Sequence, residues 1–251
     1  MTEENGTLTR ADGVVLAWRR VAGRGPTVVF LGGFNSDMTG TKAEHLAACC
    51  AARGQAFLRL DYSGHGASGG QFESGCIGDW TADAEAVIRH ATEGPLVLVG
   101  SSMGGWIALL LATRFAERLH ALVGIAAAPD FTEDLMWAKF PPEIRTAIER
   151  DGMWKRPSQY GDAYPITHRL IEDGRRHLVL RAPLPIAVPV RLLHGQRDPD
   201  VPWRLSLKTA ETIAGDDVQV VLVKDGDHRL SRPQDLALLA RTVADLLHVA
   251  D

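Results

Sequence analysis

The chain is predicted to fold as an α/β protein built on a mostly parallel, doubly wound sheet. Short apolar runs of strand length alternate with longer helical patterns along most of its 251 residues. Three of these runs, at 27–31, 96–99 and 121–127, are almost continuously apolar, as expected for strands that are buried on both faces. Helices between parallel strands must then cover both faces of the sheet.

The elements follow one another in a simple order. Residues 8–10 and 14–20 read as an edge hairpin, because the Asp12-Gly13 pair between them is a strong turn signal. Counting this hairpin, we expect a sheet of about eight strands. The other expected strands are 27–31, 55–60, 96–99, 121–127, a run beginning at 190, and 218–223, and the expected helices include 42–53, 77–92, 142–150, 164–176, 203–214 and 233–248.

The aromatic and proline content of the chain changes near residue 129. We interpret residues 1–128 and 188–251 as one core and residues 129–187 as a small helical lid inserted into it. A lid at the carboxyl ends of the strands would cover a site there, and its apolar side chains could line an acyl pocket. They could equally form the lid's own small core. The candidates are Met136, Trp137, Phe140, Met153 and Trp154.

Composition limits the class of protein. A net charge of −4, with charges of both signs scattered, gives no footprint for nucleic acid or an anionic membrane. No stretch reaches the ~20 apolar residues of a membrane span, and the polar start at 1–6 is unlike a signal or transit peptide. A cytoplasmic protein is therefore expected. The three cysteines, Cys49, Cys50 and Cys76, have no disulfide or metal spacing, although Cys76 stands in a polar loop.

The clearest chemical motif is Gly100-Ser101-Ser102-Met103-Gly104, which lies between a predicted strand and a predicted helix. In this setting G-x-S-x-G forms a sharp elbow that exposes its serine as a nucleophile. Ser102 is therefore the candidate nucleophile. Ser101 lacks the flanking glycines.

A serine hydroxyl needs a base, and the base needs an acid that fixes its tautomer. Asp198 and His228 each follow a strand, so they could meet Ser102 at the carboxyl edge of the sheet. The order Ser, Asp, His is that of the α/β-hydrolase triad. Asp200 is the nearest rival as the acid. We interpret His65 and His194 as structural histidines.

Backbone N–H groups are the expected oxyanion donors. One comes from Met103, directly after the nucleophile, and the other from Phe34, which follows the Gly32-Gly33 pair at the end of a strand.

At this point the residues resemble a known family, the α/β-hydrolases, and within it the mitochondrial palmitoyl-protein thioesterase and mycophenolic acid acyl-glucuronide esterase group. The resemblance spans nearly the whole chain. It implies Ser102, Asp198 and His228 as nucleophile, acid and base, and it implies ester or thioester substrates. The alanine-rich composition resembles that of a bacterial relative. The blocks that carry it include 30–34, 36–43, 61–64, 100–106, 191–195, 201–203 and 227–229.

Together these observations predict a serine hydrolase that cleaves carboxylic esters or thioesters through an acyl-enzyme, without metal or cofactor. Its expected partner is a small acyl ester or thioester, and its oligomeric state is left open. Two alternatives remain. The same triad could serve a carbon–carbon bond hydrolase or a peptidase, or the chain could be a ligand-binding protein that kept the fold alone.

Overall fold

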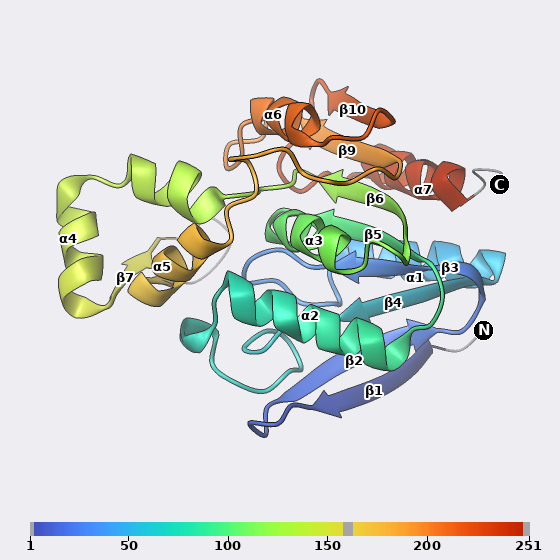
Figure 1. Cartoon of the computed structure of the whole chain (residues 1–251), viewed down its shortest axis with the longest axis horizontal. Helices are drawn as coiled ribbons and strands as arrows, with labels where there is room; N and C mark the ends of the chain where they lie inside the picture. The colour runs from blue at the N-terminus through green and yellow to red at the C-terminus, as the bar shows by residue number, and fades with distance from the viewer. Residues whose placement is uncertain (1–2, 158–162, 248–251) are drawn as a thin grey trace.

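An eight-stranded sheet forms the centre of the computed structural model, which describes residues 3–157 and 163–247 (Figure 1). The strand order is β1-β2-β4-β3-β5-β6-β9-β10. This is the α/β-hydrolase fold that the sequence predicts. The strands are β1 (Glu3–Thr9), β2 (Val15–Val21), β3 (Arg24–Leu31), β4 (Gln55–Leu60), β5 (Leu96–Ser101), β6 (Leu119–Ile125), β9 (Val190–Gly195) and β10 (Val218–Val223).

Strands β4, β3, β5, β6, β9 and β10 pair in parallel, whereas β2 is antiparallel to both β1 and β4. The predicted edge hairpin is present, but β1 begins at Glu3 rather than at residue 8 and pairs with β2 along its full length, from Glu3 opposite Val21 to Thr9 opposite Val15. The first half of β1 is polar because an edge strand is partly exposed to water. The first half of β1 therefore shows no apolar pattern, and the sequence does not predict a strand there.

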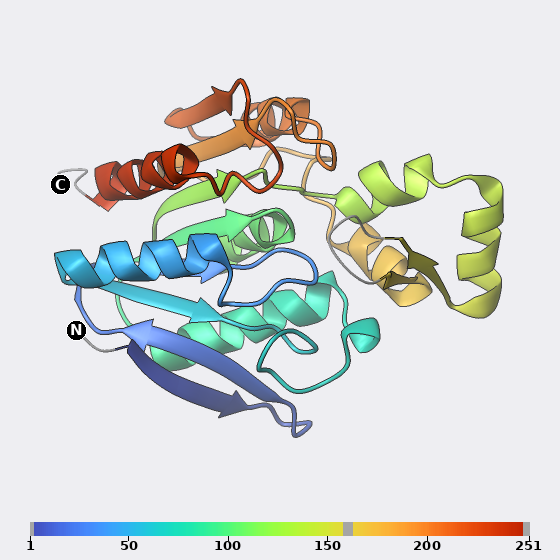
Figure 2. The same cartoon turned by 180° about the vertical axis from the view of Figure 1, so that it is seen from behind.

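Helices cover both faces of the sheet, as a doubly wound fold requires. Figure 2 shows α1 (Thr41–Arg53) and α7 (Pro233–Leu247) on one face. Their apolar side chains pack with β3, β5 and β6 in one core cluster. Three helices, α2 (Ile77–Ala91), α3 (Met103–Arg114) and α6 (Arg204–Thr212), contribute to the larger cluster on the opposite face.

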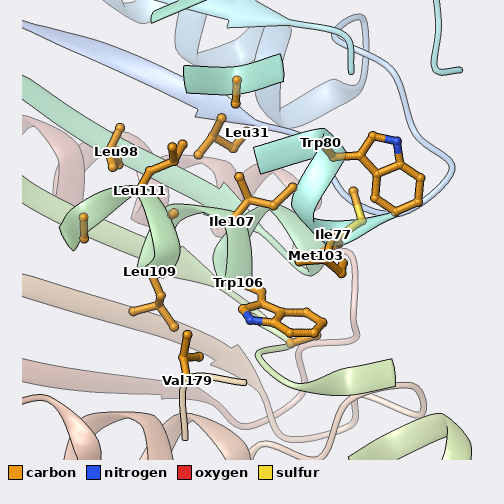
Figure 3. Packing of buried hydrophobic residues seen from close by; sticks show 14 of the residues in the cluster. Leu31, Ile77, Trp80, Leu98, Met103, Trp106, Ile107, Leu109, Leu111 and Val179 are labelled. Atoms are coloured by element: carbon orange, nitrogen blue, oxygen red, sulfur yellow. The ribbon is translucent and has the colours of Figure 1, made fainter. Parts of the chain in front are cut away.

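Helix α3 is buried on almost all sides, which fixes the start of the helix where the candidate nucleophile lies. Met103, Trp106 and Ile107 have no exposed surface, and Figure 3 shows them packed with Ile77 and Trp80 of α2. The interior of a protein is packed as densely as an organic crystal, so this helix has little freedom to move.

The chain between β6 and β9 stands to one side of the sheet and forms the lid region (Figure 1). The predicted helix over 142–150 is present as α4. The predicted helix over 164–176 is wrong in its first part, because Tyr164–Thr167 is a strand and the helix begins at His168, where the Thr167 hydroxyl accepts the Leu170 N–H. The elements are η2 (Thr132–Met136), η3 (Trp137–Lys139), α4 (Pro142–Asp151), β7 (Met153–Arg156), β8 (Tyr164–Thr167) and α5 (His168–Arg176).

Buried polar contacts stabilise this region and attach it to the core. Within the region, the Asp130 carboxylate accepts the backbone N–H groups of Val179 and Leu180. The indole N–H of Trp106, in α3, donates to the carbonyl of His177 and so joins the region to the core. Asp130 is fully buried, so both bonds replace contacts with water that the carboxylate has lost. Within residues 3–157 and 163–247, no helix has the length and apolar character needed to cross a bilayer.

Candidate active site

Ser102 lies at a strained turn between β5 and α3. Its backbone has φ 54° and ψ −118°, a conformation that non-glycine residues rarely adopt. The turn is held by β6, because the Ser102 N–H donates to Ile125 O at 2.9 Å and the Ala128 N–H donates to Ser102 O at 3.0 Å. Strain of this kind persists where the surrounding structure fixes it, and the sequence predicts this elbow at Ser102.

Two glycines allow the elbow to form. A Cβ placed on Gly104 would lie 2.1 Å from the carbonyl oxygen of Leu31, and one placed on Gly100 would lie 2.2 Å from the carbonyl oxygen of Gly104. Both contacts are far below van der Waals distance, and both are with backbone. The motif therefore needs glycine at each end so that α3 can begin directly against β3.

The structure brings Ser102, His228 and Asp198 into one hydrogen-bonded chain. Oγ of Ser102 lies 3.1 Å from Nε2 of His228, and Nδ1 of His228 lies 2.7 Å from Oδ2 of Asp198. The Asp198 side chain is fully buried, whereas the His228 ring is 19% exposed. Since Nδ1 donates to the carboxylate, Nε2 is left as the acceptor for the Ser102 hydroxyl.

Asp198 has a second histidine partner. Nε2 of His194 lies 3.1 Å from Oδ2 of Asp198 and 3.0 Å from the carbonyl of Val201, and Nδ1 lies 2.7 Å from the hydroxyl of Ser206. Both partners of Nε2 are acceptors, so Nε2 carries the proton. The sequence indicates only a structural role for His194, which is fully buried, whereas the structure shows that it also supports the carboxylate.

The electrostatics of Asp198 follow from these contacts. Burial raises the pKa of this carboxyl, but the hydrogen bonds from His194 and His228 outweigh burial and hold the pKa well below its usual range. The backbone N–H groups of Asp200 and Val201 donate to Oδ1 at 2.8 Å each. Asp198 is therefore ionised at neutral pH.

Asp200, the rival acid, lies at the rim of the same site and is exposed. Ligand atoms of Asp198, Asp200 and His228 lie within 4.8 Å of one another, which is close enough for one metal ion. However, both Asp198 oxygens already accept hydrogen bonds, and one of these comes from His228 itself. A metal would have to break this chain of hydrogen bonds, so the cluster fits proton transfer better than metal binding.

The expected oxyanion donors lie on two sides of Ser102. Met103 is the first residue of α3, so its N–H has no carbonyl partner within the helix. The loop after β3 passes close by, since a Cβ on Gly33 would lie 3.5 Å from the Cβ of Ser102. Phe34 follows in this loop, and its ring makes edge contacts with four other aromatic rings that hold the loop in place.

A cavity of about 780 Å³ opens beside Ser102 and His228. Its walls come from the loop after β3, from the loops after β9 and β10, and from the lid region. Met136 lines it, as predicted. The lining residues are Phe34, Asn35, Phe72, Glu73, Ser102, Ala128, Phe131, Leu135, Met136, Arg156, Pro157, Ala163, Tyr164, Pro165, Asp200, Val201, His228 and Arg229.

The other four predicted pocket residues do not line this cavity. Trp137 packs under two arginine guanidinium groups, and Phe140 and Trp154 contact each other with ring centroids 5.5 Å apart. Met153 is 40% exposed on the surface of β7. These side chains belong to the lid's own packing or to its surface, which is the alternative that the sequence leaves open.

His65 lies in the aromatic cluster next to Phe34 rather than in the cavity. It is buried, its Nδ1 lies 3.1 Å from the carbonyl of Ser63, and its ring contacts Tyr62, Phe72 and Trp80. These contacts give His65 a structural place in the loop. Cys76 is buried as well, and burial raises the pKa of its thiol to about 12, so it is not a reactive thiolate.

The fold and the elbow define this chain as an α/β hydrolase. Residues 24–157 match the model of a family described as serine aminopeptidase, S33. The chain belongs to this family, and the resemblance predicted from its motifs is confirmed by its relatives.

It is 39% identical to mitochondrial palmitoyl-protein thioesterase ABHD10 of Bos taurus over 96% of this chain and 79% of that protein, and 38% identical to the Homo sapiens protein over the same shares. Its backbone also matches a protein of Agrobacterium vitis S4 with a TM-score of 0.95, at 39% identity and over 99% and 100% of the two chains. Alpha/beta hydrolase domain-containing protein 10 from mouse matches with a TM-score of 0.90, at 38% identity and over 97% and 98%.

Proposed function

We propose that this protein is a serine hydrolase that cleaves carboxylic esters or thioesters through an acyl-Ser102 intermediate. The observation that carries the proposal is the chain of hydrogen bonds from Ser102 through His228 to Asp198, with distances of 3.1 and 2.7 Å. Ser102 lies at a strained elbow, its hydroxyl contacts the His228 imidazole, and the buried Asp198 carboxylate contacts the other nitrogen of the ring. This arrangement activates a serine for nucleophilic attack.

In the first step the Ser102 Oγ attacks the carbonyl carbon of the acyl group, and Nε2 of His228 takes the hydroxyl proton. The negative charge then moves onto the carbonyl oxygen, where the N–H groups of Met103 and Phe34 would stabilise it. Asp198 stabilises the imidazolium through Nδ1. His228 then gives its proton to the departing alcohol or thiol, which leaves the acyl group on Ser102.

In the second step a water molecule takes the place of the leaving group. Nε2 of His228 removes a proton from this water as it attacks the acyl carbonyl, and the same proton returns to Ser102 as the acid departs. All of these transfers use one imidazole, so they need no cofactor.

Ester and thioester substrates are favoured by the relatives, which are named palmitoyl-protein thioesterases. The cavity beside Ser102 has aromatic and apolar walls that suit an acyl group, formed in part by Phe131, Leu135 and Met136. The natural acceptor is left open. The cytoplasmic location stays a prediction, and the named relatives are mitochondrial proteins.

A peptidase is the second candidate, because the family model is described as a serine aminopeptidase. Two acids, Glu73 and Asp200, line the cavity and could bind the ammonium group of a peptide's first residue. Amides with a free amino terminus should then be cleaved, and faster than the same amides with an acetylated amino group.

One experiment tests the proposal and separates the candidates. The protein is treated with a fluorophosphonate probe and then assayed with nitrophenyl esters, acyl thioesters and aminoacyl amides. We expect labelling and ester or thioester turnover in the wild type, and neither in Ser102→Ala. If the folded wild type is not labelled and behaves like Ser102→Ala on every substrate, the protein is a non-catalytic binder and the proposal fails.

A further inference from the structure

The cavity beside Ser102 is charged as well as apolar. Six of its 18 lining residues have ionisable side chains. They come from several elements, and one of them, Arg156, comes from the end of β7 in the lid region. A pocket that held only a saturated acyl chain would gain nothing from a guanidinium group in its wall. The six residues are Glu73, Arg156, Tyr164, Asp200, His228 and Arg229.

Arg156 differs from the other arginines of the lid region. Among the residues that the structure describes, no carboxylate forms an ion pair with it. Arg145 donates to the carbonyl of Ala138 and lies over the ring of Trp137. The remaining lid arginines are all paired with carboxylates, in Arg150–Asp151, Arg169–Asp79, Arg175–Glu133, Arg176–Asp173 and Arg181–Asp134.

Tyr164 stands directly opposite Arg156 across the β7–β8 hairpin and lines the same cavity. Side chains of directly opposed residues lie on the same face of a hairpin, so the guanidinium and the phenol are neighbours. Burial raises the pKa of Tyr164, which keeps its hydroxyl a neutral donor. Its ring also contacts Phe34 with centroids 5.5 Å apart, which places the hairpin against the expected oxyanion loop.

We propose that Arg156 binds an anionic group, a carboxylate or a phosphate, that the substrate carries away from its scissile carbonyl, and that the Tyr164 hydroxyl donates to the same group. A guanidinium can bind such a group with two parallel hydrogen bonds. Glu73 and Asp200 line the same cavity and repel an anion, which disfavours anion binding beside those two carboxylates. This inference rests on the proposed function, because it names the substrate class of that site.

The test compares matched esters. Mono-nitrophenyl esters of α,ω-dicarboxylic acids carry the anion on the acyl side, and acyl esters of hydroxybenzoate carry it on the leaving group; each is paired with an uncharged ester of the same length. In the wild type we expect kcat/KM to favour the anionic member of one of these pairs. Arg156→Gln should lower that preference about tenfold or more, mainly through KM, and Arg156→Lys should retain part of it.

Lys155→Gln is the matched control, since it removes the same charge from the neighbouring position of β7, where the side chain is exposed and does not line the cavity. It should leave the preference as it is in the wild type. Equal effects of Arg156→Gln and Lys155→Gln would mean that only the overall charge of the lid matters. That result, or a wild type without preference for either anionic ester, would overturn the inference.

A binding measurement separates this inference from the proposed function. Calorimetry on Ser102→Ala, which cannot turn over the esters, should show tighter binding of the anionic ester than of its neutral partner, and the difference should be lost in Ser102→Ala/Arg156→Gln. If the wild type cleaves no ester but this difference is present, the proposed function fails and the anion site stands. If esters are cleaved but the difference is absent, the anion site alone fails.

Discussion

His194 donates a hydrogen bond from Nε2 to Oδ2 of Asp198, at 3.1 Å, and this is the same oxygen that faces His228. His194 lies at the end of β9 and Asp198 lies in the loop that follows it, and the side chains of both are fully buried. The carboxylate is thus held from two sides. Its position depends on a residue that does not itself line the cavity.

Replacing His194 by Phe should lower kcat about tenfold with little change in KM, because the carboxylate loses one charge-assisted hydrogen bond worth about 1.5 kcal/mol or more. The hydroxyl of Ser206 also loses its partner. Steady-state kinetics with an ester, beside a thermal melt, measures both effects. Ser206→Ala is the control, since it leaves the bond to Asp198 in place, and it should lower kcat far less. A His194→Phe enzyme with wild-type kcat would show that the bond does not matter for turnover.

The two acids of the β9 loop should differ sharply in their effect on turnover. Asp198→Asn removes the carboxylate that fixes the His228 tautomer, and we expect kcat to fall by about 10³ to 10⁴. Asp200→Asn keeps the backbone N–H that donates to Asp198, and we expect a loss below about tenfold. Ester kinetics on both variants decides between the acids. Similar losses in the two would contradict the assignment of Asp198.

The sheet and the three central site residues could be predicted because their signals are local. Strand β5 begins as a continuous apolar run, β9 and β10 are largely apolar, and Ser102, Asp198 and His228 follow the ends of these three strands. In a parallel sheet the carboxyl ends of neighbouring strands share one edge, so Ser102, Asp198 and His228 meet without any knowledge of long-range contacts.

The lid could not be predicted to the same degree, because its residues pack against one another over a small area. Apolar composition identifies Trp137 and Met153 as candidates but does not say which way they face, and one lies under guanidinium groups while the other is exposed. Phe131 and Tyr164 line the cavity and were missed. A signal for Phe131 was present, since it follows β6 at the same edge of the sheet as Ser102.

Gly104→Ala should abolish folding or lower the free energy of unfolding by about 3 kcal/mol or more, because the new methyl would overlap the carbonyl of Leu31. The obstacle is backbone, which cannot rotate away. Denaturant titration measures the loss. Gly69→Ala is the control, because its Cβ would meet nothing closer than 3.5 Å. A Gly104→Ala protein as stable as Gly69→Ala would mean that α3 can move away from β3.

The attachment of the lid region to α2 should depend on pH through His177. Its Nδ1 lies 2.9 Å from the carbonyl of Asp173 and 3.3 Å from the carboxylate of the same residue, which in turn accepts the N–H of Gly78 at the start of α2. The hydrogen bond to the Asp173 side chain and the negative charge of that carboxylate raise the pKa of His177 above its ordinary value. A raised histidine pKa means that the protonated form contributes stability, fully present below about pH 6.5 and lost as the pH rises through the folded-state value.

We therefore expect the melting temperature of the wild type to exceed that of His177→Asn most at acid pH, and the difference to shrink as the pH rises. Thermal melts of both proteins from pH 5 to about pH 9 give this difference directly. His168→Asn is the control, because its ring is exposed and its nearest carboxylate is 3.9 Å away, so we expect a smaller and flatter difference. A His177→Asn difference that stays constant or grows with pH would show that the neutral ring holds the lid, and that the ion pair with Asp173 contributes nothing to the attachment.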